Sequence, residues 1–374
     1  MSSAVERLLM RHAGGATPIV VGEGALAAAH EELGRWLAGR ALFVVATPRV
    51  LALHGAALEP LAAAAARSST LAVPEGEAAK TPEEATRLWR ELLAGGGKRD
   101  SRVVCFGGGS VGDLGGFVAG CFLRGVEYAQ LPTTLLAQAD ASIGGKTAVD
   151  LPESKNAVGL YHQPAMVVSE AAFLATLPPE ELRSGLAEVI KVAALLDREL
   201  LARLEADLPR LLAGEPGALG PVVAAAATAK ARLVEEDPHD QGRRALLNLG
   251  HTLGHALEGA LGYRGLRHGE AVAYGVLFAL RLSERRGLDP DFAARLRRLI
   301  GRLQLPRLPE VDPAALVAYM ARDKKAREGG LAWVLLASPG KGTVAADVEA
   351  AELAEELRRF GLDPFGAASV PREV

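Results

Sequence analysis

Four residues able to bind metal ions or anions recur at helical spacing in the second half of the chain. Arg244, Asn248, His251 and His255 follow one another at steps of four, three and four, so on one continuous helix their side chains would share a face. His268 follows in a glycine-flanked turn. Two imidazoles at i and i+4 with a third nearby are typical of a metal site, whereas the alternative is that each histidine is an ordinary core or capping residue.

A carboxylate that could complete this site occurs in the apolar segment GLAEVIK, where Glu188 precedes Lys191 by three residues. On an exposed helix such an ion pair would contribute little to stability, but in a segment this apolar we expect the carboxylate to be buried against a cation. Glu188, His251 and His268 would then form a His₂Glu set that leaves coordination positions open for substrate oxygens. This arrangement is typical of catalytic zinc, and three ligands are too few for a closed structural zinc site.

A glycine-rich turn follows the apolar segment RVVCF. Gly107, Gly109 and Gly112 fit the spacing G-x-G-x-x-G at an expected strand-to-helix turn, where backbone amides can bind a pyrophosphate. The same spacing also occurs in turns that bind no ligand. The carboxylate expected to bind a ribose should end the apolar run 41–47, but Thr47 stands there. The pattern therefore predicts either a variant nucleotide site or none.

A second glycine-rich segment, LPTTLLAQADASIGGK, ends in a lysine. Gly144 and Gly145 precede Lys146, and a flexible Gly-Gly-Lys sequence with free backbone amides is suited to binding a phosphate. Lys155 and Asn156 follow soon after. Each lysine alone would be an ordinary solvated side chain. Their density beside glycines indicates an anion site.

Six short apolar runs, separated by helical patterns, must position these residues. The alternation predicts a mostly parallel sheet covered by helices. After Leu177 the pattern is helical for most of the remaining length. For a chain of 374 residues two domains are expected, and we predict an α/β, Rossmann-like domain over residues 1–177 and an all-α domain over residues 178–374. The six runs are residues 17–22, 41–47, 69–74, 102–109, 126–132 and 165–169.

The composition is that of a globular protein without nucleic-acid-binding character. Hydrophobic residues make up 49% and charged residues 23%, and the net charge of −3 leaves no basic surplus. Charged residues interrupt the first apolar stretch, and no uncharged apolar run of about 18 residues follows, so neither a secretory signal nor a membrane span is expected. We predict a cytoplasmic protein whose two cysteines, Cys105 and Cys121, are buried free thiols.

Nine motifs, in this order and at family-like spacing, resemble the 3-dehydroquinate synthase family. The resemblance covers nearly the whole chain and implies the fold that this family shares with glycerol dehydrogenases and iron-dependent alcohol dehydrogenases. It also implies a phosphate-eliminating carbon–oxygen lyase of the shikimate pathway, which leads to the aromatic amino acids. The motifs are PEGEAAK, GGGSVGDLGGFVA, LRG, LPTTLLAQADASIGGK, KNAVG, FLATLP, GLAEVIK, LNLGHTLGHALE and RHGEAV.

The substrate implied by the resemblance is 3-deoxy-D-arabino-heptulosonate 7-phosphate, which is converted into 3-dehydroquinate and phosphate. The implied steps are transient NAD-dependent oxidation, β-elimination of phosphate, re-reduction, ring opening and intramolecular aldol closure. The implied cofactors are NAD and Zn²⁺ or Co²⁺. A homodimer is also implied, with no nucleic acid or membrane as a partner.

Carried over motif by motif, the resemblance assigns roles to three sets of residues. The implied metal ligands are Glu188, His251 and His268. The implied substrate-site residues are Asp140, Lys146, Asn156, Lys191, Lys230, Arg244, Asn248, His255 and Lys324, together with Arg124, which would reach the substrate phosphate in the neighbouring subunit. The implied NAD contacts are Glu77, Lys80, Gly108, Gly109, Ser110, Val111, Gly112, Asp113, Thr133, Thr134, Lys146, Lys155, Phe173, Thr176 and Leu177.

Two related activities stay open on the sequence. A glycerol-type dehydrogenase would share the fold, the metal and the glycine-rich turn, but it would not need several cations for a doubly anionic substrate, and net NADH production would reveal it. A sister sugar-phosphate cyclase is closer, yet sedoheptulose-type substrates have no carboxylate for Lys230 and Arg244 to bind. The family usually has an acid where this chain has Thr47, which implies weaker NAD binding and poor exclusion of NADP.

Overall fold

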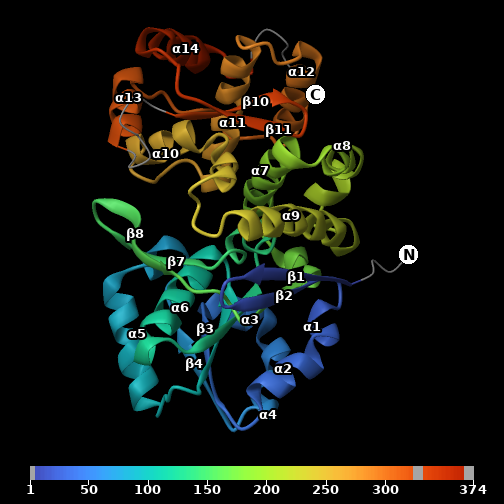
Figure 1. Cartoon of the computed structure of the whole chain (residues 1–374), viewed down its shortest axis with the longest axis vertical. Coiled ribbons are helices and arrows are strands. Elements are labelled where there is room, and N and C mark those ends of the chain that lie inside the picture. Colours follow the sequence, from blue (N-terminus) through green and yellow to red (C-terminus); the bar gives the residue numbers. More distant parts are fainter. Residues whose placement is uncertain (1–4, 323–331, 366–374) are drawn as a thin grey trace. The chain divides into compact units, whose positions relative to one another are not determined.

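A computed structural model describes residues 5–322 and 332–365 of the chain, which forms two compact units (Figure 1). The first unit joins Met1–Pro178 to Ala213–His239, and the second joins Pro179–Leu212 to Asp240–Val374. A single boundary at residue 177 therefore does not separate the two units. The chain returns to the first unit because helix α9 (Pro216–Glu236) packs against the strands β1 and β2 of that unit.

The first unit is built on a seven-stranded sheet. Six strands run parallel in the order β2-β9-β6-β5-β3-β4, and β1 adds an antiparallel edge through a hairpin that pairs Glu6 with Val21. All six predicted apolar runs are strands of this sheet, so these predictions are confirmed. The strands are β1 (Glu6–His12), β2 (Gly15–Gly22), β3 (Ala41–Ala46), β4 (Arg67–Ala72), β5 (Arg102–Gly107), β6 (Glu127–Pro132) and β9 (Met166–Glu170).

Helices cover both faces of this sheet because its inner strands are apolar on both sides. In β3, Phe43 and Val45 pack with α5 and α6, whereas Leu42 and Val44 pack with α1 and α2. Parallel strands buried in this way read as continuous hydrophobic runs, which is why the sequence revealed them. The helices of this part are α1 (Ala25–Ala28), α2 (His30–Leu37), α3 (Pro48–His54), α4 (Glu59–Ala64), α5 (Pro82–Ala94) and α6 (Gly109–Cys121).

The glycines of α6 determine how closely this helix lies on the strands. A Cβ atom on Gly112 would lie 2.8 Å from the side chain of Gln130 on β6. One on Gly116 would lie 2.5 Å from Thr147, which belongs to the separate hairpin of β7 (Lys146–Leu151) and β8 (Ser154–Tyr161). Larger residues would push the helix away from both strands. The close packing fixes the N-terminus of α6 at the carboxyl end of β5.

The two cysteines differ in burial. Cys105 on β5 is buried, and burial raises the pKa of its thiol, as expected for an inert structural cysteine. Cys121 is exposed, so the prediction of a buried thiol is wrong for this residue. The reason is that the buried part of α6 ends at Ala119, two residues before the helix itself ends.

The described residues of the second unit are helical apart from connecting segments and one hairpin that the sequence did not predict. Its strands β10 (Trp333–Ser338) and β11 (Lys341–Ala345) are antiparallel, and the buried Trp333 packs on Phe278 of α11 with ring centroids 5.4 Å apart. The helices are α7 (Pro179–Leu196), α8 (Arg198–Leu212), α10 (His251–Ala260), α11 (His268–Glu284), α12 (Pro290–Gly301), α13 (Pro313–Arg322) and α14 (Ala350–Leu362).

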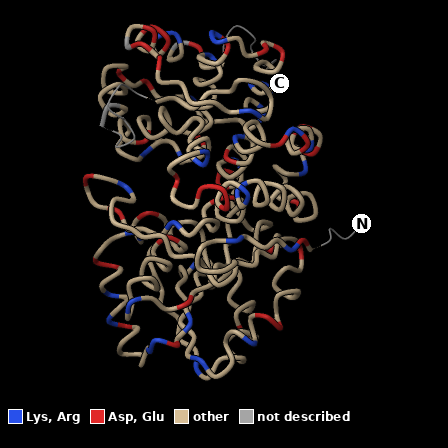
Figure 2. Tube along the Cα trace, in the orientation of Figure 1, with Lys and Arg blue, Asp and Glu red and all other residues tan. Residues whose placement is uncertain are grey.

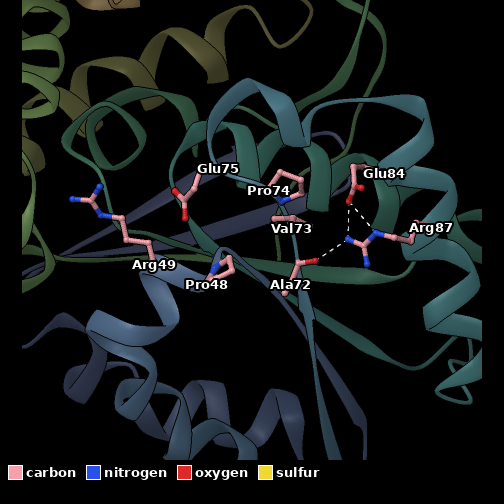
Figure 3. Close-up of a pocket in the computed structure, with 8 residues that line it drawn as sticks. All are labelled: Pro48, Arg49, Ala72, Val73, Pro74, Glu75, Glu84 and Arg87. Atoms are coloured by element: carbon pink, nitrogen blue, oxygen red, sulfur yellow. Dashed lines mark hydrogen bonds and ion pairs between the residues drawn. The ribbon is translucent and has the colours of Figure 1, made fainter.

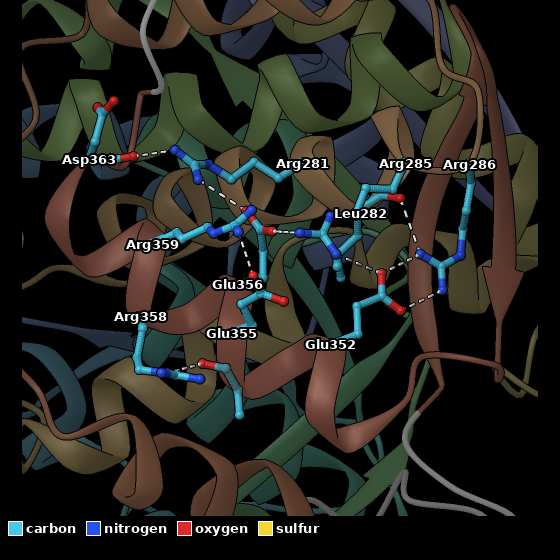
Figure 4. Close-up of polar contacts among 11 residues, drawn as sticks. Arg281, Leu282, Arg285, Arg286, Glu352, Glu355, Glu356, Arg358, Arg359 and Asp363 are labelled. Atoms are coloured by element: carbon cyan, nitrogen blue, oxygen red, sulfur yellow. Dashed lines mark hydrogen bonds and ion pairs between the residues drawn. The ribbon is translucent and has the colours of Figure 1, made fainter.

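Carboxylates of α14 pair with arginines in the last turn of α11 and directly after this helix (Figure 4). The buried Glu356 lies 3.0 Å from Arg281 and 2.6 Å from Arg285, and Glu352 lies 3.1 Å from Arg286. The planar, multidentate guanidinium groups suit such paired contacts. These ion pairs stabilise the packing of α14 against α11. α11 also carries the predicted metal ligand His268 as its first residue.

Charged residues of both signs are interspersed along both units (Figure 2), in agreement with the small net charge. Within residues 5–322 and 332–365, no helix combines the length and the apolar character needed to cross a bilayer.

Candidate active site

The second unit brings Glu188, His251 and His268 together as the sequence predicted. Glu188 comes from α7, His251 begins α10, and His268 begins α11. The Nε2 atoms of His251 and His268 lie 3.6 Å and 3.5 Å from Oε1 of Glu188. One potential ligand atom from each of the three residues lies within 4.8 Å of the other two. The three residues could therefore hold one metal ion.

The donor set fits a divalent cation because one oxygen of the buried Glu188, Oε1, faces the two imidazoles without a hydrogen-bond donor. Its side chain is only 2% exposed, and neither oxygen has a donor in hydrogen-bonding geometry, although Nζ of Lys191 forms an ion pair 2.6 Å from Oε2. Lys191 compensates Oε2, whereas the buried Oε1 is an unsatisfied acceptor that a second cation would stabilise. The sequence-based expectation that Glu188 is buried against Lys191 is therefore confirmed, and the remaining oxygen faces the two imidazoles.

The charges around the three residues also favour a cation. Burial alone would raise the pKa of Glu188, but Lys191 and His251 hold it well below its ordinary value. Burial lowers the pKa of His251 well below its ordinary value, which leaves a neutral imidazole that can act as a ligand. Burial would also lower the pKa of His268, but its contacts with Glu188 and a second carboxylate, Glu258, raise it to about 10. The two carboxylates thus create a position that attracts positive charge.

The prediction that Arg244, Asn248, His251 and His255 share one helix face is wrong. Arg244 and Asn248 lie in a 3₁₀ helix, η6 (Arg243–Asn248), and α10 begins only at His251. Gly250 interrupts the helix with a φ of 80°, in a position where a Cβ would lie 2.7 Å from the carbonyl oxygen of Val272. The chain therefore turns between the two segments, and only His251 and His255 share a helix.

The remaining predicted residues of this unit surround the cluster to different degrees. The ring of His255 lies 5.2 Å from that of His251 and 5.9 Å from that of His268. Lys191 and Arg244 are buried, and Nδ2 of Asn248 donates to the carbonyl of Ala245 at 2.9 Å. Lys324 lies outside the described residues.

The first unit holds a polar network beside the glycine-rich turn. The buried Lys80 donates to Asp113 at 3.0 Å and to Asn156 at 2.5 Å, and Ser110 donates to Glu77 at 2.9 Å. Burial alone would lower the pKa of Lys80, but Asp113 and Glu77 raise it, so this lysine stays charged. The structure thus brings together five predicted residues, four of them assigned to NAD and one to the substrate.

The turn itself has the geometry expected of an anion-binding site. Gly108 is the N-cap of α6, with Gly109 as the first helical residue, so the free amides of the first turn point out at the carboxyl end of β5. A Cβ on Gly108 would lie 3.1 Å from the side chain of Thr134, which leaves little room beside the turn. Thr134 in turn accepts from the amide of Ala137 at 3.2 Å. Thr133, Val111 and Gly112 are buried around this turn.

Asp140 and Lys230 form a second pair of predicted residues within the first unit. Nζ of Lys230, on α9, lies 2.7 Å from Oδ1 of Asp140 and donates to the carbonyl of Asp140 at 2.6 Å. Lys146 and Lys155 lie on the hairpin of β7 and β8, after the positive-φ turn of Gly144 and Gly145. The return of the chain to the first unit is what places Lys230 beside Asp140.

A hollow of about 660 Å³ lies at the carboxyl ends of β3 and β4 (Figure 3). Its lining includes Arg49 and Glu75, while Glu84 is paired with Arg87 at 2.6 Å. Thr47 is buried next to it, and its hydroxyl accepts from the amide of Val50 at 3.3 Å as the N-cap of α3. The glycine-rich turn follows β5, and β3 is the neighbour of β5 in the sheet. The hollow therefore lies at the end of the strand next to the one that precedes the turn.

Comparison with known proteins agrees with this geometry. Two family models match the chain, 3-dehydroquinate synthase N-terminal over residues 70–184 and 3-dehydroquinate synthase C-terminal over residues 185–326. The 3-dehydroquinate synthase of Symbiobacterium thermophilum is 44% identical over 352 residues, which cover 92% of this chain and 97% of the relative. The chain belongs to the 3-dehydroquinate synthase family. The family's enzyme from Methylococcus capsulatus is also 44% identical, over 92% of this chain and 96% of its own.

Solved structures extend the comparison beyond the dehydroquinate synthases. A 2-deoxy-scyllo-inosose synthase complexed with carbaglucose-6-phosphate, NAD⁺ and Co²⁺ superposes with a TM-score of 0.86 at 27% identity, over 95% of this chain and 100% of that one. A 2-epi-5-epi-valiolone synthase from Streptomyces hygroscopicus with NAD⁺ and Zn²⁺ bound gives 0.84 at 29% identity, over 97% and 99%. An iron-containing alcohol dehydrogenase from Thermotoga maritima, at 0.68 and 16% identity over 95% and 99%, shows the shared fold alone.

Among the other residues assigned from the dehydroquinate synthase family, Arg124 has an unusual backbone. It lies in η3 (Phe122–Arg124), and Leu123 and Arg124 have φ values of 49° and 70° before Gly125 at 110°. Two successive non-glycine residues with positive φ are strained. Phe173, Thr176 and Leu177 lie in or directly after η5 (Ala171–Thr176), where Phe173 packs on Phe106 at 5.5 Å.

Sequence reasoning missed Glu258. This residue lies on α10, is buried, and its Oε2 lies 3.1 Å from Nδ1 of His268. The available signal was a carboxylate three residues after His255 in the otherwise apolar end of LNLGHTLGHALE.

Proposed function

We propose that the protein converts 3-deoxy-D-arabino-heptulosonate 7-phosphate into 3-dehydroquinate and phosphate. The observation that carries the proposal is the buried cluster of Glu188, His251 and His268 in a chain whose relatives, at about 44% identity over nearly their whole length, are 3-dehydroquinate synthases. The structures of sister cyclases match less closely in sequence, at 27% and 29%. This difference favours the dehydroquinate synthase reaction over that of another cyclase.

Glu188, His251 and His268 would hold Zn²⁺ or Co²⁺, in line with the metals bound to the two sister cyclases. Such an ion supplies Lewis-acid polarisation of the substrate hydroxyl that is oxidised. The residues themselves orient the site: the carbonyl of Leu249 holds Nδ1 of His251 at 3.2 Å, and this contact leaves Nε2 facing Glu188. Lys191, beside Glu188, adds positive charge next to the substrate oxygens.

The first unit would bind NAD through the amides at the N-terminus of α6 and the network of Glu77, Lys80 and Asp113. Oxidation of the C5 hydroxyl to a ketone makes the neighbouring C6–H acidic, so phosphate can leave by β-elimination. Return of the hydride restores the hydroxyl, and after ring opening the enol closes onto the C2 ketone. When held by these residues, NAD would supply this reversible oxidation, and no net NADH would form.

The cationic residues would bind the two anionic ends of the substrate. We assign the carboxylate to Arg244 and Lys230, with Asn248 at a nearby hydroxyl, and the phosphate to Lys146, Asn156 and His255, with Lys324 as a further cation. Charge-assisted hydrogen bonds of this kind fix the substrate and hold the reacting atoms in register. Asp140, paired with Lys230 at 2.7 Å, orients that ammonium group.

We further propose a cytoplasmic homodimer in which Arg124 reaches the substrate phosphate of the neighbouring subunit. A functional role for this segment is supported by the strained backbone at Leu123 and Arg124, because such strain clusters at functional sites. Six further residues stay predicted NAD contacts, namely Thr133, Thr134, Lys155, Phe173, Thr176 and Leu177.

The proposed function is tested by direct turnover. Purified protein, loaded with zinc and NAD, should release phosphate and dehydroquinate in equal amounts from the heptulosonate phosphate, without net NADH. A glycerol-type dehydrogenase would instead accumulate NADH, and the absence of phosphate release from a metal-loaded, folded protein would refute the proposal.

A further inference from the structure

We propose that Glu258 is a positioning residue of the metal site, whose carboxylate fixes the imidazole nitrogen that His268 presents to the ion. This inference rests on the metal-dependent function proposed above. Oε2 of Glu258 lies 3.1 Å from Nδ1 of His268, while Nε2 of the same ring lies 3.5 Å from Oε1 of Glu188. The ring is therefore held between two carboxylates, one at each nitrogen.

The proton on the imidazole decides which nitrogen can bind a metal. An imidazole binds a cation only through a nitrogen lone pair, so a metal ion takes the place of the proton on one nitrogen while the other nitrogen keeps its N–H. Since a carboxylate accepts hydrogen bonds, Glu258 selects the form with the proton on Nδ1 of His268. Nε2 then presents its lone pair on the side where Glu188 and Nε2 of His251 lie.

The two histidine ligands are oriented by different chemistry. Nδ1 of His251 lies 3.2 Å from the backbone carbonyl of Leu249, two residues away on the same chain segment. His268 has a carboxylate from another helix in the equivalent place. A carboxylate partner makes the imidazole a stronger ligand than a carbonyl does and adds negative charge near the ion. Glu258 should therefore affect metal affinity as well as ring orientation.

The helices α10 and α11 cross in such close contact that the side chain of Glu258 lies next to that of His268. A Cβ on Gly254 would lie 3.2 Å from the backbone of Val272, so the two helices are in close backbone contact at this point. Four residues forward on α10 is Glu258, and four residues back on α11 is His268. Because residues four apart lie on the same face of a helix, the contact at Gly254 brings the two side chains together one turn further on.

A competing assignment makes Glu258 a metal ligand. Donor atoms of His255, Glu258 and His268 also lie within 4.8 Å of one another, so these three could in principle hold an ion of their own. The two assignments share His268 but differ in stoichiometry. A positioning role gives one ion per chain, whereas a second site gives two.

The test compares zinc binding to wild-type protein, Glu258→Gln and Glu270→Gln. Glutamine keeps the size of the side chain but removes its charge. Glu270 is the matched control, because it is also buried, lies two residues from His268, and caps the amide of Arg267 at 2.8 Å without touching the metal cluster. Zinc affinity is measured by competition with a chromophoric chelator and stoichiometry by metal analysis, on metal-free proteins whose folding is checked by circular dichroism.

We expect one zinc ion per chain in all three proteins, with affinity weakened about 10–100-fold in Glu258→Gln and unchanged in Glu270→Gln. Equal affinity in wild type and Glu258→Gln would overturn the inference, and so would two ions in wild type with one in the variant. Wild-type protein that binds no zinc would instead refute the metal-dependent function itself. If Glu258→Gln does not fold, ¹⁵N-histidine NMR of zinc-loaded wild type decides: the inference requires His268 bound through Nε2 with Nδ1 protonated, and binding through Nδ1 contradicts it.

Discussion

Replacing Gly250 by alanine should destabilise the helical unit more than the same change at Gly265, although both glycines have positive φ. Their φ values are 80° and 88°. A Cβ at Gly250 would lie 2.7 Å from the carbonyl oxygen of Val272 and 2.8 Å from Val276, whereas at Gly265 nothing lies within 4 Å. The pair of variants therefore separates the backbone conformation from the packing of α10 on α11.

The expected magnitudes follow from these two contributions. An alanine forced to positive φ costs about 1–2 kcal/mol, and the lower entropy of its unfolded chain offsets about 0.4–1 kcal/mol of this. Gly265→Ala should thus lower the free energy of unfolding by about 0–1.6 kcal/mol. Gly250→Ala must also move the backbone of α11, and overpacking of this kind typically costs about 1–3 kcal/mol more.

The assay uses a tryptophan that reports on the helical unit. The sequence has three tryptophans, of which Trp333 is buried in the second unit, while Trp36 and Trp89 lie in the first. In a background with Trp36 and Trp89 changed to phenylalanine, urea unfolding is followed by the fluorescence of Trp333. If Gly250→Ala unfolds at the same urea concentration as Gly265→Ala, the close contact between α10 and α11 is not present in solution.

Three further predictions concern the cofactor, the dimer and the last helix. Thr47→Asp can still cap α3 and should strengthen NAD binding about 10–150-fold in a fluorescence titration, because one hydrogen bond to a charged group contributes about 1.5–3 kcal/mol. NADP binding should weaken, and unchanged NAD affinity would count against this role. Mixing the inactive variants Arg124→Ala and Lys146→Ala should restore about a quarter of wild-type activity, because half of the randomly re-paired dimers carry one intact site of two. Mixtures that exchange subunits and yet stay inactive would exclude a shared site. Glu356→Gln should lower the free energy of unfolding by about 1–3 kcal/mol, because it removes the buried negative charge that pairs with Arg281 and Arg285. Glu355→Gln should have little effect, because Glu355 is half-exposed and pairs with a residue of its own helix, Arg359. Equal stabilities of the two variants would contradict this.

The sequence predicted those parts of the fold that repeat a single physical pattern. The strands of the parallel sheet are buried on both faces, so β3 and β5 appear as unbroken apolar runs. β1 has one buried residue, Met10, and its sequence ERLLMRH shows neither a continuous apolar run nor a regular alternation, so it was not expected. The hairpin of β10 and β11 is short and was also missed, because its apolar residues resemble those of the surrounding helices.

The site was harder to predict where it depends on contacts between distant segments. The helical spacing of Arg244 and Asn248 continues into His251, but Gly250 breaks the helix because α11 packs against it. The ligand set could be assembled from residue chemistry alone. Glu258 could not, because its partner is decided by the register in which α10 crosses α11.

The most direct test of the central claim is the fate of a deuterium placed on C5 of 3-deoxy-D-arabino-heptulosonate 7-phosphate. If the protein oxidises and re-reduces this carbon within one turnover, the dehydroquinate formed should keep the deuterium at the same carbon, and NADH free in solution should carry none. Dehydroquinate that has lost the label, or labelled NADH accumulating in solution, would contradict a transient oxidation at this site.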